Sequence, residues 1–146
     1  MIIMNNTMKL LNHIYQDAQM GAGSITTVLE HSKDSAFTDD LRTQKGIYDD
    51  IRGKAQDMIE GAGGEVKGLN LMEKARTNIM IDMQTLTDES TSHLAEMMII
   101  GTNMGVIESL KKLREYEDGA DSQALDLMTS LLDHEENAIK RLKEYL

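Results

Sequence analysis

Apolar side chains recur at helical spacing along nearly the whole chain, and this pattern predicts five helical segments. The segments are expected at residues 6–31, 38–61, 69–86, 89–117 and 121–145. Residues typical of helix ends separate them, among them the glycine-rich stretch at 61–68 and Gly119. The pattern therefore predicts an all-α protein in which residues 1–146 form one helical-bundle domain.

The first two predicted helices present an inward side without charged groups. When residues are placed 100° apart, segment 6–31 shows an apolar stripe from Leu11 to Leu29, with His13 and His31 on the opposite, solvated side. Segment 38–61 likewise keeps its carboxylates off the inward stripe. We therefore expect neither helix to contribute a carboxylate or a histidine to the interior.

Segment 121–145 differs because Glu135 lies in the middle of its apolar face. Burying a carboxylate is costly unless it accepts hydrogen bonds, and Gln44 and Tyr48 carry suitable donors on segment 38–61. The sequence therefore predicts a central buried polar layer of Gln44, Tyr48 and Glu135, which would fix the register of the helices.

Segment 89–117 carries apolar residues on two sides. The stripe expected to face inward consists of His93, Met97, Ile100, Gly101, Met104 and Ile107. The second stripe consists of Ile99, Val106, Leu110 and Leu113. A helix with this pattern is buried on both sides, either by segment 69–86 or by a second copy of the chain. We expect a homodimer, with the second stripe as its contact face.

Charge and composition narrow the range of partners. The chain has 25 acidic and 15 basic side chains, and its net charge of -10 opposes binding to nucleic acid or anionic lipid. Cysteine is absent, which excludes disulfides and thiolate metal sites. The short apolar run at the start does not resemble a secretory signal, and no run reaches about 20 apolar residues. We expect a cytoplasmic protein with neither nucleic acid nor a membrane as partner.

Four long segments of similar length, joined in the middle by a stretch that can span a bundle, predict two hairpins connected by a long crossover. Together with the runs LRTQKGIYDDI (41–51) and HLAEMMIIGTNMG (93–105), this layout resembles the ferritin-like superfamily, in particular small rubrerythrin-like and spore-coat-like bundle proteins of Gram-positive bacteria. The resemblance implies an up-and-down four-helix bundle with a fifth helical segment in the crossover. A helical bundle of another lineage is the alternative.

The resemblance also directs attention to metal binding. A ferritin-like di-iron centre takes Glu from two helices and Glu-x-x-His from two others, and this sequence contains no Glu-x-x-His. The inward positions at the corresponding level are expected to be Ala22, Gln44, Gly101 and Glu135. Since only Glu135 among them is a strong ligand, we expect no cofactor. Iron or manganese held through Glu135, His93 or Glu89 is the alternative.

Catalytic motifs are also missing from the sequence. It has no strand-to-helix nucleophile turn, and a single inward histidine does not define a catalytic triad. We therefore expect a non-catalytic bundle that acts through self-association or by binding another protein. The alternatives are a reduced ferritin-like protein that binds or oxidises metal at Glu135, and a small-ligand carrier with a cavity near Ala22 and Gly101.

Overall fold

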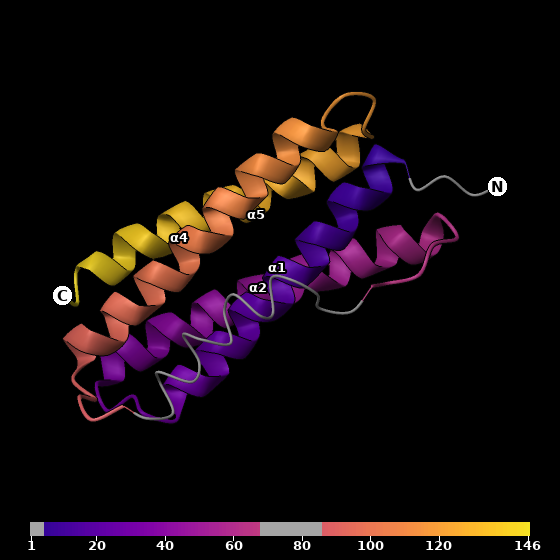
Figure 1. The fold of residues 1–146 in the computed structure, drawn as a ribbon. Helices are drawn as coiled ribbons and strands as arrows, with labels where there is room; N and C mark the ends of the chain where they lie inside the picture. The colour runs from indigo at the N-terminus through magenta and orange to yellow at the C-terminus, as the bar shows by residue number, and fades with distance from the viewer. Residues whose placement is uncertain (1–4, 68–85) are drawn as a thin grey trace.

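The computed structural model describes residues 5–67 and 86–146, and within these ranges the chain forms four long helices and no strands (Figure 1). They are α1 (Asn6–Leu29), α2 (Ser35–Gly61), α4 (Thr91–Tyr116) and α5 (Ser122–Lys143). The predicted all-α class is confirmed for this part of the chain. Apart from Leu86, the helix predicted at 69–86 lies outside the described residues.

Side-chain caps determine where three of the helices begin. The side chain of Asn5 accepts a hydrogen bond from the backbone N–H of Met8 at the start of α1, and Ser90 caps α4 in the same way. Asp34 accepts from the N–H of Phe37 at 2.8 Å, so α2 begins at Ser35, three residues before the predicted start.

The ends of the helices define the direction of the chain. Asn6 donates a hydrogen bond to the carbonyl of Asp118, which places the start of α1 beside the turn between α4 and α5. At the opposite end, His31 contacts Glu89 at 2.8 Å just before α4 begins. Thus α1 and α5 run in one direction and α2 and α4 in the other, as Figure 1 shows. Residues 62–90 connect the two hairpins from one end of the bundle to the other.

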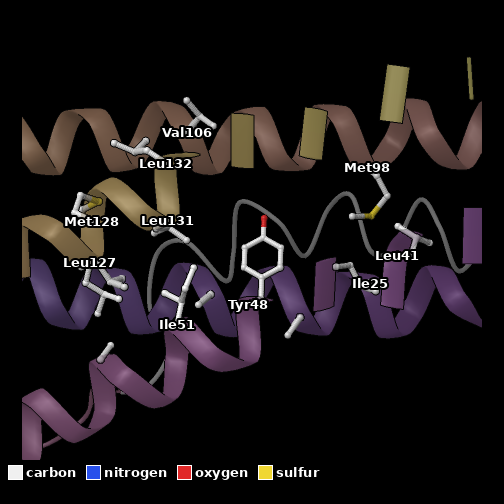
Figure 2. Packing of buried hydrophobic residues seen from close by; sticks show 14 of the residues in the cluster. Ile25, Leu41, Tyr48, Ile51, Met98, Val106, Leu127, Met128, Leu131 and Leu132 are labelled. Atoms are coloured by element: carbon white, nitrogen blue, oxygen red, sulfur yellow. The ribbon is translucent and has the colours of Figure 1, made fainter. Parts of the chain in front are cut away.

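The four helices are packed around a shared core. Helices α1 and α5 contact each other, and each also contacts both α2 and α4, so α1 and α5 lie on the short diagonal of the bundle. Figure 2 shows Tyr48 of α2 among aliphatic side chains of the core. Other members of this cluster that the figure labels are Ile25, Leu41, Ile51, Met98 and Leu131.

The structure corrects the prediction for α1. This helix is buried around most of its circumference between Leu10 and Ala22, whereas the apolar pattern predicted one buried side. His13, expected in solvent, is buried, and Asp17 is fully buried, so α1 does bring a histidine and a carboxylate inside. Helix α1 packs against three helices, and Lys67, in the segment after α2, also contacts Asn12 and Gln16 on α1.

Helix α4 is rotated relative to the prediction. Ile100 and Ile107 were expected to face inward, but both are exposed. The residues of α4 that are buried are Leu94, Ala95, Met97, Met98, Thr102, Gly105, Val106 and Ser109. This face is rich in small residues, which allow close approach of the neighbouring helices α1 and α5. The buried face coincides with neither predicted stripe, because Met97 belongs to the first stripe and Val106 to the second.

Candidate functional site

Tyr48 and Glu135 form a buried hydrogen-bonded pair between α2 and α5. The hydroxyl of Tyr48 donates to Oε2 of Glu135 at 2.9 Å, and both side chains are almost completely inaccessible. In Figure 2 the Tyr48 ring extends from α2 into the interior. Gln44, the third residue of the predicted layer, is buried about one turn earlier on α2, but its amide makes no hydrogen bond within the described ranges. The structure thus brings together two of the three residues.

His134 lies directly before Glu135, in the charged run DHEE (133–136), and it is also buried. Its ring meets the Tyr48 ring edge to face, with centroids 4.4 Å apart. Burial lowers the pKa of His134 to about 4, and the negative charge of Asp17 opposes this shift only in part. The imidazole is therefore neutral near pH 7.

A second buried polar contact joins α1 to α4. Nε2 of His13 lies 2.8 Å from the hydroxyl oxygen of Ser109, and both side chains are buried. Among the described residues, the interior thus contains a polar contact between α2 and α5 as well as one between α1 and α4. Polar contacts that must be satisfied inside an apolar core favour one helix register over others. We interpret both contacts as determinants of the fold.

Replacing Tyr48 by Phe tests the α2–α5 contact. The change removes the hydroxyl that donates to Glu135 and keeps the ring that packs in the core. We expect the free energy of unfolding to fall by about 1 to 2 kcal/mol, because a buried acceptor loses a donor. Chemical denaturation measures this loss. An unchanged midpoint would show that the hydrogen bond contributes nothing to stability.

The residues considered for metal binding do not meet. Glu89 lies before α4, where it accepts a hydrogen bond from His31 and forms an ion pair with Lys33. The hydrogen bond from His31 is the main cause that lowers the pKa of Glu89. His93 is partly exposed in the first turn of α4, while Glu135 lies in the core. Within residues 5–67 and 86–146, no three histidine, aspartate or glutamate side chains are grouped to hold a metal ion.

A surface groove lies between α2 and α5, away from the cavity expected near Ala22 and Gly101. It has a volume of about 410 Å³, and its lining includes Gln44, Ile47 and His134. The amide atoms of Gln44 and Nε2 of His134 lie beneath the protein surface, so a molecule in the groove would not reach them. The cavity expected from the sequence would have been lined by Ala22 and Gly101. Ala22 is buried, and a Cβ added at Gly101 would meet no atom within 4 Å, but neither residue lines the groove.

The outer side of α4 carries a row of exposed apolar side chains, which we call the α4 face. It consists of Ile100, Ile107 and Leu110, which are 50%, 45% and 43% exposed, together with the partly buried Met104. Their spacing of three or four residues places them on one side of the helix.

The contact face predicted from the sequence was therefore largely wrong. Of its four residues, Val106 is buried, and Ile99 and Leu113 pack against the core. Leu110 alone belongs to the exposed α4 face. The pattern indicated apolar residues on two sides of this helix, but it placed Ile100 and Ile107 inside and Val106 on the contact face, the reverse of what the structure shows.

Comparison with protein-family models, curated proteins and solved structures gives no match for this chain. Among the helices in the described part, none combines the length and the apolar character needed to cross a membrane.

Proposed function

We propose that this chain is a non-catalytic, ferritin-like helical bundle that acts by self-association through the α4 face. Two antiparallel hairpins joined by a connection from one end of the bundle to the other support the ferritin-like part of the proposal, because one long crossover is typical of that class. The buried polar contacts then hold the helices in register, and the α4 face supplies the contact with a second molecule.

The single observation that carries the proposal is the alignment of exposed apolar side chains on α4. An isolated exposed isoleucine is ordinary on a protein surface. Here Ile100, Ile107 and Leu110 follow one another along one side of a helix, with Met104 beside them. Such a contiguous apolar row favours a protein contact, since covering it removes apolar area from water.

A second copy of the chain is the partner that we propose. Most closed assemblies of identical chains are two-fold dimers, in which the same patch of each molecule contacts the other. A straight row of apolar side chains on a helix suits this arrangement because two such rows can pack along each other. A single type of surface is then sufficient for assembly.

Replacing both Ile100 and Ile107 by lysine tests the proposal. The wild-type chain is expected to sediment as a dimer and the double variant as a monomer, because four lysines would meet at the contact of two variant copies. The variant should keep its helical circular dichroism, since both positions are about half exposed and project away from the core.

Ile47→Lys provides the matched control. Ile47 is 42% exposed but lies on α2, which contributes no residue to the α4 face. This variant should remain a dimer. A wild-type protein that stays monomeric at millimolar concentration, or a double lysine variant that stays dimeric, would refute self-association through the α4 face.

A further inference from the structure

Two charged side chains lie at opposite ends of the α4 face. Glu96 precedes Ile100 and Arg114 follows Leu110, and both charged residues are exposed. They are separated by about five helical turns, or 27 Å, so they project from the same side of the helix as the apolar row. Neither Glu96 nor Arg114 forms an ion pair with another residue in the described part of the chain.

The positions of these charges are symmetric about the apolar row. The row from Ile100 to Leu110 has its midpoint at Gly105, and Glu96 and Arg114 lie equally far before and after that residue. A two-fold axis through this midpoint, perpendicular to the helix, would place Ile100 of one copy beside Leu110 of the other. The same axis would place Glu96 of one copy beside Arg114 of the other.

We propose that two copies pair antiparallel through their α4 faces, with two reciprocal Glu96–Arg114 contacts at the ends of the apolar row. This inference rests on the proposed self-association and specifies its geometry. A parallel pairing would instead place Glu96 beside Glu96 and Arg114 beside Arg114. Like charges placed in contact disfavour an interface, so the charges select the antiparallel arrangement.

The other charges of this region do not change that choice. Lys111 has its ammonium 3.7 Å from a carboxylate oxygen of Glu108 on the same helix, which partly neutralises both. Asn103, near the centre of the row, is exposed and uncharged. The whole chain carries a net charge of -10, so two copies repel each other in general. A contact face with opposite charges at its two ends offsets this repulsion locally.

Charge reversal and charge exchange test the inference. Glu96→Arg and Arg114→Glu would each create two like-charge contacts in the antiparallel dimer, and each should raise the dissociation constant by roughly five- to thirtyfold. The double variant E96R/R114E exchanges the two charges and should restore the wild-type dissociation constant to within about threefold. Sedimentation equilibrium measures all four proteins, and high salt should reduce the differences between them.

Cross-linking gives a second test, which benefits from the absence of cysteine in the natural chain. Glu96→Cys and Arg114→Cys are prepared separately and treated with a short bifunctional maleimide. Cross-linked dimers are expected when the two variants are mixed and not when either is treated alone. Parallel pairing would give cross-linked dimers with each variant alone.

The outcomes separate this inference from the proposed function. A monomeric wild-type chain would overturn both. A wild-type dimer that the two isoleucine-to-lysine changes dissociate, but that forms cross-links with each cysteine variant alone, would overturn only the antiparallel arrangement. Failure of the charge exchange to restore association would likewise overturn the Glu96–Arg114 contacts and leave the α4 face as the site of association.

Discussion

Acidification from pH 7.5 to pH 4 is expected to lower the free energy of unfolding by about 3 kcal/mol through His134 alone. Burial lowers the pKa of this imidazole from 6.5 to about 4 in the folded protein. As the pH falls below 6.5, the unfolded chain binds a proton at His134 that the folded chain does not. Stability is therefore retained above pH 6.5 and lost progressively as the pH falls towards 4.

Comparison with His134→Phe isolates this contribution. Phenylalanine keeps a ring against Tyr48 and cannot bind a proton, so the variant should lack the part of the loss due to His134, about 1 kcal/mol by pH 5.5 and about 3 kcal/mol by pH 4. Urea unfolding at a series of pH values gives the measurement.

A histidine outside the core provides the control. His93→Phe makes the same substitution at a partly exposed residue in the first turn of α4, so it shows how much of any change comes from replacing a histidine by phenylalanine outside the core. If His134→Phe and the wild-type protein lost stability in parallel between pH 7.5 and pH 4, the neutral, buried state of His134 would be refuted.

The sequence predicted the four described helices, because apolar side chains recur along each of them at helical spacing. It also indicated Glu135 as an interior residue, since a carboxylate in the middle of an apolar face has no solvated side to occupy. Tyr48 followed as a donor on the facing helix, and the structure places its hydroxyl 2.9 Å from that carboxylate.

Periodicity could not predict the other buried polar groups. His13 and Asp17 lie off the apolar stripe of α1, and they are buried because this helix contacts α2, α4 and α5. The number of helices that pack against α1 depends on how the whole bundle assembles. It therefore cannot be predicted from the sequence of α1 alone. His134 was missed for a related reason, because it lies at the edge of the stripe of α5 and faces Tyr48.

The orientation of α4 was ambiguous in the sequence for a different reason. Two apolar stripes on one helix have similar periodicity, and the larger side chains, such as Ile100 and Ile107, suggested the wrong inner side. Close packing in the bundle favours the side with Gly105 and Ser109. The sequence of α4 did contain an indication of the inner side. Small residues between large ones allow closer packing of neighbouring helices than a row of bulky side chains alone.

Gly21→Ala is expected to lower the free energy of unfolding by about 3 kcal/mol. A Cβ at this position of α1 would lie 2.5 Å from Cζ of Tyr48, with two further ring atoms within 2.7 Å. The Tyr48 ring is enclosed by the core and must shift, which also displaces the hydroxyl that donates to Glu135. This cost exceeds the gain of up to about 1 kcal/mol that alanine brings to a helix interior.

Two further variants establish that the loss comes from contact with Tyr48. Gly23→Ala lies on the same helix, where an added Cβ meets no atom within 4 Å, and it should stabilise the protein by about 0.5 to 1 kcal/mol. In the Tyr48→Leu background, Gly21→Ala should lower the free energy of unfolding much less, because the ring that clashes is absent. A double-mutant cycle gives the interaction energy between the two positions. Equal effects of Gly21→Ala in the two backgrounds, measured by urea unfolding, would mean that the glycine is required for some reason other than the close approach of Tyr48.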